Sequence, residues 1–233
     1  MGESSPQALL IIAASEADSN LYYACRFLAP DPFVFLQVDG IKLLLMSDLE
    51  IDRAQKEAAV DEICSLSAYE SKARERWATP HLIDTLSLLL EERGARAVTV
   101  PANFPVEYAD RLREKGVRVT PKPDPFFPER LIKSAEEIAA IEATQRHTEA
   151  ALDAALNVLR ESEITDGLVY WRGAPLTAEA LRKVMHVSLM ERECIAEHTI
   201  VASGIQGVDP HNQGSGPIRA HESLVFDVFP RSS

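Results

Sequence analysis

The residue types with the clearest chemical potential are one histidine and one carboxylate, His211 and Asp227. His211 follows a proline in a polar, glycine-rich stretch, whereas Asp227 interrupts the apolar run Val225–Phe229. Burying a bare carboxylate in an apolar strand is costly, so a buried Asp227 would need a metal ion, a cation or several donors. On a half-exposed strand, solvent would stabilise the carboxylate, and His211 could equally be a loop histidine bound to backbone. The sequence therefore nominates both residues and leaves the plainer alternatives open.

The segments around these two residues predict a pair of strands joined by a glycine-rich loop. Residues 199–202 form an apolar run, and a second run begins at Leu224. Two helices are expected before them. The first begins at the capping box Ser134–Glu137, and the second covers about Thr177–Met190. Leu181, Val184, Met185 and Leu189 follow the period of one buried helix face.

The first half of the chain alternates between strand and helix signals. Asp39-Gly40 separates two apolar runs and predicts a hairpin. Helix starts are expected at the capping-box spacing Ser47–Glu50 and at Thr79-Pro80. This alternation predicts a three-layer α/β domain with a mixed sheet. The proline-rich stretch 121–125 then predicts a stiff linker, so we place a first domain at residues 1–130 and a second at 131–233.

The other chemically capable residues favour structural interpretations. The three cysteines are far apart and form no CxxC pair, so a disulfide framework or a structural zinc site is not expected. The remaining histidines stand at no metal-ligand spacing such as His-x-x-x-His. Ser203-Gly204 lacks the spacing of a nucleophile elbow, and residues 214–216 are too short for a phosphate loop.

The composition of the chain limits which binding partners and which cellular compartment are expected. Lys and Arg number 24 and Asp and Glu number 36, which gives a formal net charge of -12. An acidic chain lacks the basic footprint that nucleic acid binding requires, and it is not attracted to anionic membranes. The polar residues 1–7 carry no basic targeting region, and the apolar run after them is too short to span a membrane. We expect a cytoplasmic protein that binds neither nucleic acid nor membrane.

The C-terminal pattern resembles a known enzyme family. Ile200–Gly204, Pro210-His211 and Leu224–Asp227 are similar to the opening strands of the pita-bread metallopeptidases, the creatinase, aminopeptidase P and prolidase family. The stretch 131–138 resembles that family's entry into its catalytic domain, which the resemblance makes a partial α+β pita-bread domain. One departure is His221-Glu222, where the family usually has Gly-Asp. Residues 19–23 and 28–32 look like parts of the family's creatinase-type N-terminal domain.

The resemblance implies a site with two divalent metal ions that activate a water molecule for peptide hydrolysis. Manganese is favoured in such carboxylate-rich sites, with cobalt, iron or zinc as alternatives. By position Asp227 matches the first aspartate ligand, and His211 matches a histidine that approaches the substrate without binding metal. The family's other ligands would follow Ser233, so this chain is expected to hold no metal and to be inactive alone. The family also implies short peptide substrates, cleavage near proline and a homodimer.

Two other functions stay open at this point. Pita-bread domains without metal ligands act as peptide- or protein-binding modules, in which Asp227 would be vestigial. Creatinase itself, an amidinohydrolase for a small molecule, shares the fold but not the metal ligands. The match of Asp227 to a ligand position favours the peptidase over creatinase.

Overall fold

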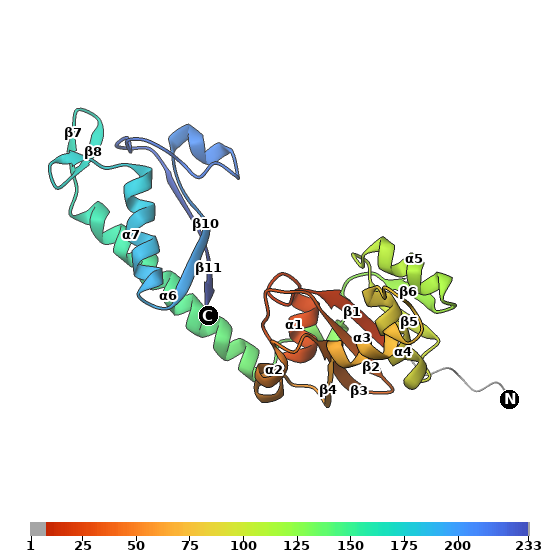
Figure 1. The fold of residues 1–233 in the computed structure, drawn as a ribbon. Coiled ribbons are helices and arrows are strands. Elements are labelled where there is room, and N and C mark those ends of the chain that lie inside the picture. The colour runs from red at the N-terminus through yellow and green to blue at the C-terminus, as the bar shows by residue number, and fades with distance from the viewer. Residues whose placement is uncertain (1–7, 233) are drawn as a thin grey trace. The chain divides into compact units, whose positions relative to one another are not determined.

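A computed structural model describes residues 8–232 and divides the chain into two compact units, Met1–Ile132 and Lys133–Ser233 (Figure 1). The predicted domain boundary after residue 130 lies two residues before this division. Residues 1–7, on which part of the targeting argument rests, lie outside the described chain. Within residues 8–232, no helix combines the length and apolar character needed to cross a membrane.

The first unit is built on a six-stranded mixed sheet with the order β4-β3-β2-β1-β5-β6. The pairs β1–β2 and β2–β3 are antiparallel, whereas β1–β5, β3–β4 and β5–β6 are parallel. This confirms the predicted α/β class with a mixed sheet. The strands are β1 (Ala8–Ala13), β2 (Phe33–Val38), β3 (Ile41–Met46), β4 (Glu62–Ser65), β5 (Ala97–Pro101) and β6 (Arg118–Lys122).

Helices cover both faces of this sheet and make three layers. Leu10, Leu36 and Leu45 face one core with side chains of three helices, and Ile11, Phe35 and Leu44 face the other core with side chains of two. The alternation follows from strand geometry, because successive side chains point to opposite faces. The helices of the first core are α3 (Leu66–Arg74), α4 (Leu82–Glu92) and α5 (Val106–Glu114), and those of the second are α1 (Ser19–Cys25) and α2 (Ile51–Glu57).

The hairpin predicted at Asp39-Gly40 is present. β2 ends at Val38 and β3 begins at Ile41, and these two residues are register partners. Asp39 and Gly40 have φ values of 49° and 89°. A two-residue turn with both φ values positive matches the twist of the flanking strands, which is why Asp-Gly suits it.

Two predicted helix starts are wrong by a few residues. The capping box at Ser47 does not form, because the Glu50 carboxylate that would complete it accepts instead from Arg53 Nη2 at 2.6 Å, and α2 begins at Ile51. α4 begins at Leu82 rather than at Pro80. His81 is its N-cap, and the Asp84 carboxylate accepts from the His81 N–H at 2.7 Å.

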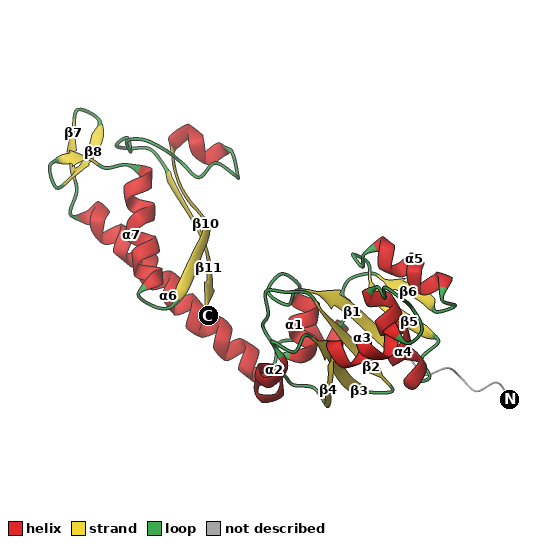
Figure 2. Ribbon diagram, viewed as in Figure 1, coloured by secondary structure: helices red, strands yellow, loops and turns green. Residues whose placement is uncertain are grey.

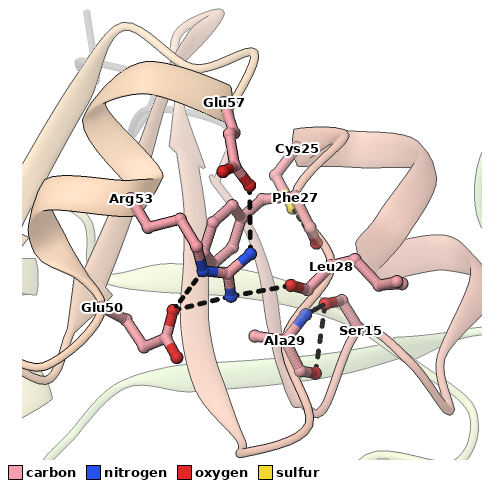
Figure 3. Close-up of polar contacts among 8 residues, drawn as sticks. All are labelled: Ser15, Cys25, Phe27, Leu28, Ala29, Glu50, Arg53 and Glu57. Atoms are coloured by element: carbon pink, nitrogen blue, oxygen red, sulfur yellow. Dashed lines mark hydrogen bonds and ion pairs between the residues drawn. The ribbon is translucent and has the colours of Figure 1, made fainter.

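Arg53, a partly exposed residue of α2, links this helix to the segment after α1 (Figure 3). Arg53 donates to Glu50 and Glu57, at 2.6 and 3.0 Å, and to the Leu28 carbonyl at 2.9 Å. Its guanidinium carbon also lies 4.2 Å from the centre of the Phe27 ring. Beside it, the Ala29 N–H donates to Ser15 Oγ at 2.7 Å. These contacts fix the irregular stretch between α1 and β2.

The second unit pairs two helices with two small sheets (Figure 2). The capping box predicted at Ser134 is present, and the N–H of Glu137 donates to Ser134 Oγ at 3.2 Å. Leu181, Met185 and Leu189 are fully buried as predicted, in a core shared with the ribbon β10–β11. The elements are α6 (Ala135–Arg160), β7 (Glu163–Thr165), β8 (Leu168–Trp171), β9 (Ala174–Pro175), α7 (Ala178–Met190), β10 (Cys194–Ser203), the 3-10 turn η2 (Gly204–Val208) and β11 (Leu224–Ser232).

Candidate functional site

Asp227 lies on the antiparallel ribbon β10–β11, opposite Ile200. Its strand neighbours Phe226 and Val228 pack against the core of the second unit. Because side chains alternate along a strand, Asp227 projects from the other face of the ribbon. The flanking residues of that face are Val225 and Phe229, whose side chains are 40% and 50% exposed. The carboxylate therefore stands on an apolar, open surface rather than in the core.

The Asp227 carboxylate is half buried and makes no hydrogen bond or ion pair with any residue in 8–232. Partial exposure lets water stabilise its charge, so burial alone does not demand a ligand. An unpaired carboxylate between apolar neighbours nevertheless keeps all its oxygen lone pairs available. The arrangement suits a carboxylate that binds a cation without first having to break an ion pair.

A β-bulge distorts the ribbon just before the partner of Asp227. The register shifts between Glu197 and Ile200, and His198 has a positive φ of 53°. Thr199, within the bulge, is 2% exposed, and its hydroxyl has no hydrogen-bond partner among the described residues. Bulges bend a strand and change the direction in which its side chains point. This one sets the orientation of the half of the ribbon that carries Asp227.

His211 lies in the loop that connects η2 to β11. Its side chain is exposed, and its backbone N–H donates to Asp209 Oδ1 at 2.9 Å. The imidazole makes no hydrogen bond within residues 8–232. The plainer alternative, an imidazole bound to backbone, is therefore not what the structure contains.

The loop after His211 packs directly on β10. The Val201 N–H donates to the Gln213 carbonyl at 3.1 Å. Gly214 has a φ of +79°, and a Cβ there would lie 1.8 Å from the Val201 carbonyl oxygen. Only glycine allows this approach. Since Val201 is adjacent to Ile200, the His211 loop and the Asp227 strand are attached to neighbouring residues of β10.

Two side chains of α7 also hold this loop. Arg182 Nη1 donates to the carbonyls of Gln213 and Gly214, the latter at 2.8 Å. The Glu179 carboxylate accepts the Gly216 N–H with both oxygens at 3.1 Å. Hydrogen bonds from its own backbone N–H and from that of Gly216 hold the pKa of Glu179 below its usual range. Sequence reasoning missed both residues, because each is more than thirty positions from its loop partner.

The described residues do not assemble a metal centre by themselves. Within 8–232, no group of three or more His, Cys, Asp or Glu side chains is placed to hold a metal ion. Asp227 would supply one carboxylate, and His211 is not grouped with it as a ligand. The residues present thus fit one ligand of a carboxylate-rich site and not a complete pair of metal ions.

The cysteines occupy structural positions. Cys25 and Cys194 are buried, as expected for small core residues, and all three thiols are free. Cys194 Sγ lies 3.3 Å from His147 Nδ1, a contact that links β10 to α6. Cys194 is 3% exposed, so its thiol is closed to substrates.

No protein-family model matches this chain, and no curated protein sequence does. Solved structures do match over almost its whole length. A prolidase from Pyrococcus horikoshii OT3 is 20% identical with a TM-score of 0.70, covering 98% of this chain and 57% of its own. An Xaa-Pro dipeptidase from Bacillus anthracis is 16% identical with a TM-score of 0.74, covering 96% and 56%. An X-Pro aminopeptidase from Thermotoga maritima MSB8 is 17% identical with a TM-score of 0.70, covering 96% and 58%.

The chain has the fold of the pita-bread Xaa-Pro peptidases. The resemblance predicted from the C-terminal pattern is thereby confirmed at the level of the fold. This Xaa-Pro peptidase fold extends over both units, from the mixed sheet of the first to the ribbon that carries Asp227. The chain spans between 56% and 58% of the length of these solved structures.

Proposed function

We propose that this chain belongs to a metal-dependent exopeptidase that hydrolyses short peptides next to proline. The observation that carries the proposal is the fold, which matches prolidases and Xaa-Pro peptidases across 96% to 98% of the chain. The open, unpaired carboxylate of Asp227 on the β10–β11 ribbon supports it. A fold alone does not determine chemistry, so the proposal depends on this site as much as on the likeness.

Within this proposal the two candidate residues have different roles. Asp227 contributes one carboxylate to a pair of divalent metal ions, manganese foremost, that would polarise the scissile carbonyl and activate water. His211, whose imidazole is exposed and free of hydrogen bonds, contacts the peptide substrate. We further propose that the protein acts as a homodimer in the cytoplasm. Residues 8–232 do not complete the metal site, so no catalytic step is assigned to the metal ions here.

A non-catalytic binding module is the second candidate, and one observation favours it. Residues 8–232 contain no cluster of metal-ligating side chains, so the described chain alone presents a surface rather than a reactive centre. In that case Asp227 and the apolar residues beside it, Val225 and Phe229, would contact a peptide or protein without cleaving it. An amidinohydrolase resembling creatinase is less favoured, because the sequence resemblance matches Asp227 to a ligand position of the metallopeptidases.

Turnover of peptides separates these candidates. We expect the protein expressed from its complete reading frame to release free amino acids from Xaa-Pro dipeptides or tripeptides when manganese is added, and a chelator to abolish the reaction. The 233-residue chain alone is expected to show no turnover above a metal-free blank. Peptide binding without any cleavage by the complete protein would favour the binding module. Creatine hydrolysis without peptidase activity would favour the amidinohydrolase.

A further inference from the structure

We propose that Arg182 and Glu179, in the first turns of α7, are positioning residues that fix the loop bearing His211 relative to the strand bearing Asp227. Their catalytic meaning rests on the proposed function, in which His211 contacts the substrate. Neither residue touches the candidate ligand carboxylate. They act through the backbone of residues 213–216, which begin two positions after His211 in the chain.

Arg182 binds two successive carbonyl groups. The same nitrogen, Nη1, donates to Gln213 O and to Gly214 O, and the side chain is half buried. Other groups bind the neighbouring carbonyls of the turn: Gln206 Nε2 donates to Ser215 O and the Ala178 N–H donates to Gly216 O, both at 3.0 Å. A charged guanidinium makes stronger hydrogen bonds than these neutral donors, so Arg182 contributes strongly to the path of the turn.

Glu179 secures the other end of the same turn. Both of its carboxylate oxygens accept from the Gly216 N–H, at 3.1 Å each. On the opposite side of that residue, the Ala178 N–H donates to the Gly216 carbonyl at 3.0 Å. The start of α7 therefore binds both the donor and the acceptor of Gly216, which prevents the loop from sliding along the helix.

β10 provides the opposing surface of the clamp. Gly214 lies against the Val201 carbonyl with no room for a side chain, and the Val201 N–H donates to Gln213 O. Gln213 O is thus shared by Arg182 and Val201. Because Val201 adjoins Ile200, the register partner of Asp227, one rigid assembly relates the His211 loop to the Asp227 strand.

The experiment compares loop order in three variants of the full chain. Arg182→Ala removes both carbonyl contacts, and Arg182→Lys keeps a charged donor. Arg192→Ala is the matched control, because Arg192 follows the C-terminal end of α7 and donates to a carbonyl of that helix, Ser188 O at 2.7 Å, rather than to the loop. Amide hydrogen exchange at Val201 and Gly216 reports the clamp directly, because these N–H groups donate to Gln213 O and to the Glu179 carboxylate. Exchange at Gly214, whose N–H donates to Asn212 Oδ1, reports the order of the turn itself.

We expect Arg182→Ala to accelerate exchange at these amides by about tenfold or more while the thermal midpoint stays near that of Arg192→Ala. Arg182→Lys should restore most of the protection, which a general loss of stability would not explain. Unchanged exchange in Arg182→Ala, or equal acceleration in Arg192→Ala, would overturn the proposal. If Arg182→Ala fails to fold, Arg182→Lys against Arg182→Gln gives the same comparison with smaller changes in volume.

A second readout separates this inference from the proposed function. In a protein that cleaves Xaa-Pro peptides, Arg182→Ala should lower kcat by about 10- to 100-fold with a smaller change in KM, because small misplacements of a catalytic group are costly. Loss of loop protection with kcat unchanged would end the catalytic part of the inference. Absence of turnover in the wild-type protein would refute the proposed function, while the exchange data would still decide whether the clamp exists.

Discussion

At the scale of single residues, two charged side chains, Arg53 and Asp227, differ in how many polar partners they have. Arg53 makes ion pairs with two glutamates, donates to a carbonyl and stacks on a ring, so all of its functional groups are used. Asp227 makes no polar contact in the described chain, although apolar side chains flank it. A residue with every contact satisfied stabilises a fold, whereas an unpaired carboxylate is free to bind a ligand.

The role of Arg53 predicts a loss of stability in the first unit. Arg53→Met keeps the apolar stem over Phe27 but removes the ion pairs and the bond to Leu28 O. We expect the free energy of unfolding to fall by about 1 kcal/mol, a modest value because the side chain is 38% exposed and water screens the pairs. Arg74→Met, which removes only one exposed pair with Glu70, should change it by less than about 0.5 kcal/mol. Equal losses in urea unfolding would contradict this role.

The lowered pKa of Glu179 predicts that acid loosens the His211 loop. Its folded pKa lies below the unfolded value of 4.5, so the anchor contributes fully above pH 4.5 and is lost as the pH falls through the folded pKa. Exchange at Gly216, corrected for intrinsic rates, should accelerate in acid relative to neutral pH. Glu179→Gln keeps a neutral acceptor, so its protection should not depend on pH in this range. The same acid response in both proteins would contradict the assignment.

At the scale of elements, local sequence signals predicted helix starts correctly where other contacts did not compete with them. At Ser134 both hydrogen bonds of the capping box are present, whereas at Ser47 the Glu50 carboxylate binds Arg53 instead. On α6, Ile138 and Ile141 stand at helical spacing but are exposed, and the buried residues of this helix are Ala151, Ala155 and Val158. The spacing of apolar residues predicts which face of a helix is buried only where the rest of the fold packs against that face.

The residues of the candidate site were predictable from the sequence, but their arrangement in space was not. An aspartate inside an apolar strand and a histidine in a glycine-rich loop are visible in the sequence, so Asp227 and His211 could be nominated. Their attachment to adjacent residues of β10 depends on the bulge near Thr199 and on strand register, which no local pattern encodes. Arg182 and Glu179 meet the loop only through the packing of α7 on β10, so sequence spacing gave no signal for them.

The packing of α7 predicts a cooperative loss of the second unit. Leu181 of α7 is fully buried in the core that α7 shares with α6 and the ribbon. Leu181→Ala should therefore lower the free energy of unfolding by about 2–5 kcal/mol. Lys183→Ala, on the exposed face of the same helix, should change the free energy of unfolding only slightly. Fluorescence of Trp171 in a Trp77→Phe background reports this unit alone, since the chain has two tryptophans. Similar midpoints for the two variants would show that this face of α7 is not a core.

At the scale of the whole molecule, the two units differ in how completely they bury apolar surface. The mixed sheet of the first unit has a core on each face. In the second unit the ribbon leaves Ile195, Val225 and Phe229 at least 40% exposed. Exposed apolar residues grouped on a two-stranded ribbon are typical of a surface that another segment or partner covers.

Limited proteolysis tests this difference in the isolated chain. We expect a protease-resistant fragment that ends near the division at Ile132 and rapid cleavage after residue 134, because the first unit is self-sufficient and the second is not. Mass spectrometry of the early fragments identifies the cut sites. A resistant C-terminal half with a labile N-terminal half would contradict the expectation.

The most direct measurement of the central claim is the rate at which the complete protein, with manganese, hydrolyses an Xaa-Pro dipeptide before and after Asp227→Asn. The matched control is Asp153→Asn, on an exposed position of α6. Loss of a metal-ligating carboxylate should reduce kcat/KM by at least about 100-fold, a loss of transition-state stabilisation of roughly 2.7 kcal/mol or more, while the control keeps wild-type activity. Undiminished hydrolysis by Asp227→Asn, or none by the wild-type protein, would contradict the account.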